Sequence, residues 1–222
     1  MATNPAFSDL PASILRPLSV SEVAAIEGIE RKVVNRMIDD GVLPGSLVRI
    51  RKAEKGVAMA RYLMPAACPM VRFNTTTGTY LNATIRARLM HRIGLLATRG
   101  IGSPVETEGA MSIDLEQVIA ESVSGMRRLA AAEDEVVIDP DIRGGMPVLR
   151  GTRIGVHEVA DLAERVSVKD LLEDYPSLTA DRIEAARLYA RAHPRAGRPR
   201  KAKGAPRGAR KVSSETIDLG TL

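Results

Sequence analysis

A single stretch, residues 136–199, most constrains the fold, because it combines two strand signals, a glycine turn and three helix signals in one short unit. Residues 136–138 and 146–149 predict two short strands, and the glycine pair between them predicts a turn with positive φ. Three short helices are expected to follow, over residues 156–165, 168–174 and 179–192. Three short helices with tight turns are typical of helix-turn-helix domains. The stretch holds no catalytic set, so we expect a binding role and no enzymatic activity.

Residues 18–64 predict a winged helix-turn-helix that binds DNA. Ser19 followed by Glu22 forms a capping box, which places the start of a first helix near Val20. A second, amphipathic helix is expected from about Glu30, and the alternating residues after it predict a hairpin wing. The expected DNA contacts are the polar residues of the second helix and the wing, namely Arg31, Lys32, Asn35, Arg36, Arg51 and Lys52. The alternative is that these residues form only a solvated helix face.

Residues 65–132 predict a helical connector between two such units. One helix is expected over residues 82–99 and a second over residues 114–132, each with an apolar stripe at helical spacing. Such stripes are far more often core than ligand-binding surface. The residues between the two helices, GIGSPVETEG, predict a linker.

Residues 195–222 predict a basic tail that is disordered until an acidic partner binds it. The window from Arg191 to Lys211 holds nine basic residues and no acid, so the rest of the chain is net negative although the whole carries +5. A tail with so few apolar residues cannot repay its ordering entropy alone. Its expected contacts to a protein or to DNA are Arg195, Arg198, Arg200, Lys201, Lys203, Arg207, Arg210 and Lys211. It either enters an A·T-rich minor groove or pairs with the carboxylates of a nuclease, and a solubilising tail is the third alternative.

The composition and the motifs predict the compartment of the protein and whether it binds a metal or a cofactor. One cysteine rules out an intramolecular disulfide framework, and neither a signal peptide nor a long apolar run is present, so a cytoplasmic protein without membrane contact is expected. Asp139 and Asp141 are more typical of an Asx turn than of a Mg²⁺ site. The three histidines, His91, His157 and His193, show no ligand spacing. We therefore expect no metal and no cofactor.

Two motifs give a family resemblance. DPDIRGGMPVLRGTRIGVHEVADL and LLEDYPSLTADRIEAARLYARAHPRAGRP resemble domain-of-unknown-function family 433, and most closely its VapB-type antitoxins with an added N-terminal DNA-binding segment. The resemblance implies an antitoxin that neutralises a PIN-like ribonuclease toxin and represses its own operon by binding operator DNA. No catalytic residues carry over, and the GTR step is expected to be structural. The alternative is a stand-alone transcriptional regulator without a toxin partner.

The expected fold class is therefore mainly α. Two small helix-turn-helix-type domains with short β-hairpins, residues 18–64 and 133–194, are joined by the helices of residues 65–132 and followed by the basic tail. Small regulators of this kind read two half-sites together. We accordingly expect a homodimer, formed through the strands of residues 136–149 or the adjoining helix.

Overall fold

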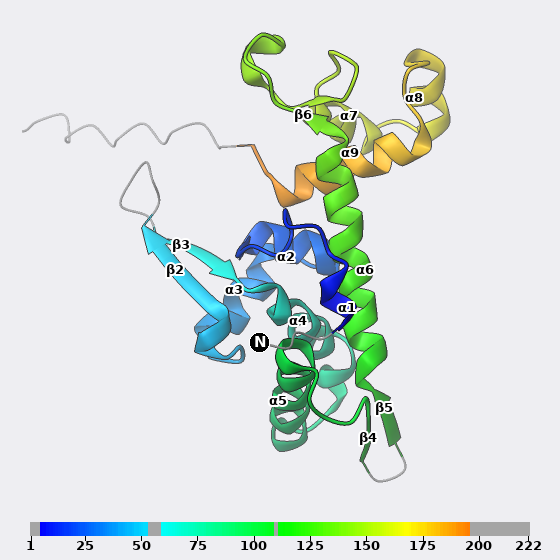
Figure 1. Ribbon diagram of the computed structural model, residues 1–222. Helices are drawn as coiled ribbons and strands as arrows, with labels where there is room; N and C mark the ends of the chain where they lie inside the picture. The colour runs from blue at the N-terminus through cyan, green and yellow to red at the C-terminus, as the bar shows by residue number, and fades with distance from the viewer. Residues whose placement is uncertain (1–4, 53–58, 109–110, 196–222) are drawn as a thin grey trace, which may run out of the picture.

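The computed structural model describes residues 5–52, 59–108 and 111–195, and within these it is mainly helical, as predicted (Figure 1). Its helices are α1 (Pro5–Ser8), α2 (Val20–Glu27), α3 (Arg31–Asp39), α4 (Cys68–Thr75), α5 (Ala83–Arg99), α6 (Leu115–Asp134), α7 (Val156–Ala163), α8 (Val168–Asp174) and α9 (Ala180–Ala192). Its strands are β1 (Leu18–Ser19), β2 (Val48–Lys52), β3 (Met59–Leu63), β4 (Val105–Glu108), β5 (Met111–Asp114), β6 (Val136–Val137) and β7 (Val148–Leu149). Short 3₁₀ turns occupy Gly45–Leu47, Pro65–Ala67, Thr77–Tyr80 and Arg143–Gly145.

The helix-turn-helix begins where the sequence predicts it. The Ser19 hydroxyl accepts from the Glu22 backbone N–H, and the Glu22 carboxylate accepts from the Ser19 N–H, which completes the capping box. Gly28 ends α2 with φ +68°, a conformation that favours glycine, and lets the chain reverse into α3. Val34 and Met37 of α3 are buried against α2. The outer face of α3 is thereby left to solvent.

The wing is a three-stranded antiparallel sheet in the order β1-β3-β2. Leu63 pairs with both Leu18 and Val48, so the sheet is tied to the residues that start the first helix. Both long strands confirm the predicted hairpin. The polar turn predicted at Lys52 to Gly56 begins one residue later, because Lys52 belongs to β2. Residues 53–58 lie outside the described residues, as do the tail cations Arg198, Arg200, Lys201, Lys203, Arg207, Arg210 and Lys211.

The connector contains more structure than its sequence suggested. Helix α5 starts at Asn82, whose side chain accepts from the Ile85 N–H, as an N-cap residue does. The linker prediction was wrong, because β4 pairs with β5 over Val105 to Asp114. Helix α4 was also missed, although its Phe73 is completely buried.

Helix α6 runs along the whole molecule and joins its two ends (Figure 1). Its predicted apolar stripe is confirmed, because each of its members is buried, namely Leu115, Val118, Ile119, Ser122, Met126 and Leu129. Gly125 lies on this face where α6 meets α2. A Cβ there would lie 2.6 Å from the Ile26 carbonyl oxygen, so the close approach of the two helices requires a glycine.

The C-terminal unit has its own small core. Strands β6 and β7 pair antiparallel, with Val136 opposite Leu149, while Ile138 and Met146 of the predicted strands lie outside them and are exposed. Helices α7, α8 and α9 enclose Leu149 and residues such as Ile183. The other edge of β7 is covered, because the Leu149 N–H donates to the Ile154 carbonyl at 3.0 Å. Strand β7 therefore has backbone partners on both of its edges.

Helix α9 belongs to both cores. Tyr189 packs into the C-terminal core, whereas Ala192 is buried in the core formed by residues 7–130. Leu188 also packs against that larger core. The C-terminal unit is thus fixed against both α2 and α6 by one of its own helices.

Candidate functional site

The outer face of α3 carries the polar residues predicted to contact DNA. Arg31, Lys32 and Arg36 are exposed, and Asn35 is half-buried. The anchoring residues Val34 and Met37 alternate with them at helical spacing. The structure therefore brings the four predicted residues of this helix onto one accessible surface.

The wing positions Asn35. The Asn35 Oδ1 accepts from Arg61 Nη1 of β3 at 3.3 Å, and the same nitrogen lies 2.8 Å from Asp39 Oδ1 at the end of α3. Arg61 thus ties the wing to the helix and fixes one side of the amide. Arg61 was not among the predicted DNA contacts, because its only signal in the sequence was its position in the alternating strand.

The other basic residues near α3 have weaker ties. Lys32 Nζ lies 2.7 Å from Glu30 Oε2, but both side chains are about 70% exposed, so this pair adds little stability. Arg31 Nη1 donates to Ser21 Oγ over 3.4 Å. The Arg36 side chain has no hydrogen bond or ion pair within the described residues. The cations of this face are therefore held only weakly by the rest of the protein.

The wing residues face two directions. Ile50 lies opposite Arg61 across the β2–β3 ladder, so Ile50 shares the sheet face that meets α3. Arg51, one position further along β2, points to the other face. The structure therefore does not place Arg51 on the same face as Asn35. Lys52 pairs with Met59 at the end of the described ladder.

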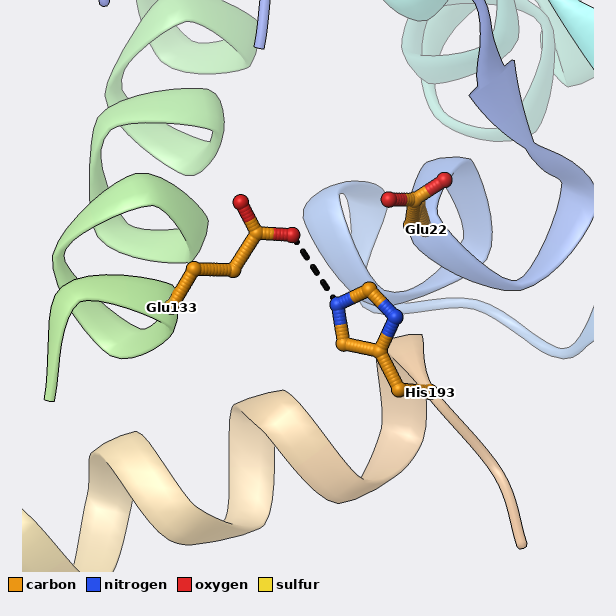
Figure 2. A group of neighbouring side chains, drawn as sticks. All are labelled: Glu22, Glu133 and His193. Atoms are coloured by element: carbon orange, nitrogen blue, oxygen red, sulfur yellow. Dashed lines mark hydrogen bonds and ion pairs between the residues drawn. The ribbon is translucent and has the colours of Figure 1, made fainter. Parts of the chain in front are cut away.

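A partly buried polar cluster joins the helix-turn-helix to the C-terminal unit (Figure 2). His193 Nε2 lies 2.9 Å from Glu133 Oε1, at the end of α6. Arg16 Nη2 bridges the same oxygen at 3.4 Å and Glu22 Oε1 of α2 at 2.5 Å. Burial alone would raise the pKa of Glu22, but hydrogen bonds from Arg16 and Ser19 outweigh it and hold that pKa below its ordinary value. Residues far apart in sequence thus form one ion-pair network.

The same cluster has the donor types of a metal site. One ligand atom each from Glu22, Glu133 and His193 lies within 4.8 Å of the others. However, the Glu22 carboxylate already accepts from Arg16 through one oxygen and from the Ser19 N–H, at 2.6 Å, through the other. A cation would have to displace the Arg16 guanidinium, which already supplies the positive charge. The cluster is therefore best understood as a junction between α2, α6 and α9.

The polar side chains of the C-terminal motifs form hydrogen bonds within the turns of their own unit. Asp139 Oδ1 accepts from the Asp141 N–H at 2.9 Å, which is the Asx turn predicted for this pair. Thr152 Oγ1 donates to the Leu149 carbonyl at 2.8 Å and accepts from the Ile154 N–H. These polar groups therefore stabilise the turns of the C-terminal unit.

Two arginines link the turns and helices of the same unit. Arg143 forms a bidentate pair with Glu158, at 2.6 and 2.7 Å, and its φ of +51° is strained for a residue other than glycine. Arg182 binds Glu135 at 3.1 Å and donates to the Arg150 carbonyl at 2.7 Å. These arginines therefore hold the turns and α9 in place.

Comparison with known proteins identifies the family. A family described as "Protein of unknown function (DUF433)" matches residues 136–190. Over nearly its whole length the chain is similar to the uncharacterized protein y4eO of Sinorhizobium fredii, with 30% identity over 218 residues that cover 94% of this chain and 95% of y4eO. The chain belongs to the y4eO family and carries a DUF433 domain. No solved structure matches it.

The DUF433 domain ends close to the helix-turn-helix. Its helix α9 carries Arg191, which is exposed, and is followed by Arg195, the first residue of the predicted tail and the last described one. Arg195 Nη1 lies 3.1 Å from Asp161 Oδ2, and both side chains are more than half exposed. In the described part of this y4eO-family chain, no helix has the length and apolar character needed to cross a membrane.

Proposed function

We propose that this protein is a DNA-binding antitoxin without enzymatic activity, which represses its own operon and neutralises a PIN-like ribonuclease toxin. One observation carries the DNA-binding part: α3 is anchored by Val34 and Met37 and presents Asn35 and Arg36 outward beside a β-wing. A helix of this kind enters the major groove, where asparagine and arginine make bidentate contacts with base edges. Half-site recognition by a homodimer is part of this proposal.

Alanine at position 35 or 36 is expected to weaken specific DNA binding about 10-fold or more, because one good base contact is worth about 1–3 kcal/mol. Gel-shift titration against the DNA upstream of the gene measures the effect. Lys169→Ala is the control, because Lys169 is an exposed cation on α8, which lies in the C-terminal unit apart from α3 (Figure 1). If Asn35→Ala and Arg36→Ala both bind like the wild type, α3 is only a surface and the proposed DNA contact is wrong.

The antitoxin part of the proposal is supported by the DUF433 domain and by the charge of the tail. PIN-like nucleases gather carboxylates around metal ions, and the cations from Arg195 to Lys211 are a complementary partner for such a site. Pairing in an active site of low dielectric is stronger than pairing at an exposed surface.

Truncation after Pro194 is expected to weaken inhibition of the cognate nuclease and to leave specific DNA binding largely intact. The truncated chain loses the Arg195–Asp161 pair, which contributes little because it is exposed. RNA cleavage by the nuclease in the presence of the full-length or the truncated protein measures inhibition, and gel shift measures DNA binding. Unchanged inhibition would contradict docking of the tail on the toxin, whereas lost DNA affinity with a flatter salt dependence would favour the minor-groove alternative.

A further inference from the structure

A hollow of about 670 Å³ lies beside the recognition helix, between α2 and α3. Its walls come from the start of α2, including Ser21, and from the first half of α3, including Arg31, Lys32 and Asn35. Ile29 and Glu30, in the turn between these helices, also line it. The last wall residue is Arg191, in the final turn of α9, the helix that ends the DUF433 domain. Two separate units of the protein thus line one hollow at the DNA-facing side of the helix-turn-helix.

The charges of the hollow favour an anion. Arg31, Lys32 and Arg191 are opposed there by a single acid, Glu30. Glu30 is already paired with Lys32. The Arg191 side chain is exposed and has no hydrogen bond or ion pair within the described residues. Its guanidinium is therefore available for a phosphate, which arginine binds with a planar fork of donors.

The position of Arg191 is fixed. It precedes Ala192, which is buried in the N-terminal core, and follows Tyr189, which is buried in the DUF433 core. The next residue, His193, is held by Glu133 at 2.9 Å. The guanidinium is thus carried by a helix end that cannot shift relative to α3 without disturbing both cores.

We propose that Arg191 makes the DUF433 domain part of the DNA-binding surface, by contacting the phosphate backbone that flanks the bases read by α3. When a recognition helix lies in the major groove, the preceding helix crosses the backbone. The hollow between these two helices therefore faces phosphates. This inference rests on the proposed DNA binding and adds to it a residue outside the helix-turn-helix. A phosphate contact positions the protein but reads no sequence.

Arg191→Gln is expected to weaken binding several-fold to the upstream DNA and to unrelated DNA alike. It is also expected to reduce the slope of log K against log salt by about 1, as the loss of one phosphate contact does. Arg191→Lys keeps the charge and is expected to retain most of that slope. Arg127→Gln is the matched control: Arg127 is an exposed arginine of α6 that is not part of the hollow. Filter binding of the full-length proteins at several salt concentrations measures all three.

Asn35→Ala distinguishes this inference from the proposed function. If Asn35→Ala reduces specific binding and Arg191→Gln behaves like Arg127→Gln, the phosphate contact is wrong and DNA recognition by α3 stands. If neither variant differs from the wild type, both proposals are wrong. If Arg191→Gln retains DNA binding but loses nuclease inhibition, the hollow serves a protein partner, and the phosphate contact is again overturned.

Discussion

Phe73→Ala is expected to lower the free energy of unfolding by about 3–5 kcal/mol, the largest effect we expect from a single substitution. Phe73 is completely buried in α4, where this helix packs against α2, α5 and α6. Truncation removes the apolar surface of the ring and leaves a cavity in a core that has few aromatic side chains to close it. Urea unfolding followed by far-ultraviolet circular dichroism measures the change, because the chain has no tryptophan.

Tyr80→Ala is the matched control for this substitution. Tyr80 is an aromatic residue close by in sequence, but its side chain is 89% exposed, so its loss is expected to change the stability by no more than about 0.5 kcal/mol. Equal unfolding free energies for the two variants would show that α4 is not part of the core.

Glu27→Gln is expected to flatten the dependence of stability on pH. The Glu27 carboxylate is fully buried at the end of α2, and burial raises its pKa to about 7 even though Arg72 Nε lies 2.8 Å away. Neither oxygen has a hydrogen bond of good geometry, so the cost of burying the charge is poorly offset.

The sign of the effect follows from the two protonation equilibria. An unfolded glutamate titrates near pH 4.5 and folded Glu27 near 7, so between these values the folded protein binds the extra proton. The stability contributed by this group is therefore complete below about pH 4.5 and is lost as the pH rises through 7. Between pH 5 and 8 the loss amounts to about 2–3 kcal/mol.

Urea unfolding at pH 5, 6, 7 and 8 tests this expectation. The wild type should lose stability across the series, whereas Glu27→Gln should lose about 2–3 kcal/mol less. Glu121→Gln is the control, because Glu121 also pairs with Arg72, at 3.1 Å, but is about half exposed. Parallel pH profiles for Glu27→Gln and Glu121→Gln would contradict a buried, protonatable Glu27.

Local signals in the sequence were sufficient for most helices. The Ser19–Glu22 capping box joins groups only three residues apart, so its meaning does not depend on the tertiary fold. The apolar stripe of α6 could also be predicted, because apolar residues recur at helical spacing from Leu115 to Leu129, over about four turns. Helix α4 has only eight residues and a weak pattern, and it exists because the core packs around Phe73.

The candidate site was predicted only in part, because several of its contacts join residues far apart in sequence. Asn35 was identified from the pattern of its helix, but its partner Arg61 lies 26 residues away. Glu133 meets Arg16 across 117 residues and His193 across 60, so no spacing rule could have found their cluster. Arg191 was counted with the basic tail, and only the packing of α9 shows that it lies beside α3.

Because α9 is shared by both cores, the stretch that matches the DUF433 family and the unit that folds have different boundaries. The DUF433 match ends at residue 190, two residues before Ala192 enters the core of the N-terminal part. A fragment cut at that boundary would lose this anchor and His193, and would expose the face of Leu188 that packs against the same core. In such a fragment the apolar face of α9 lies open to solvent unless a second subunit or another domain covers it.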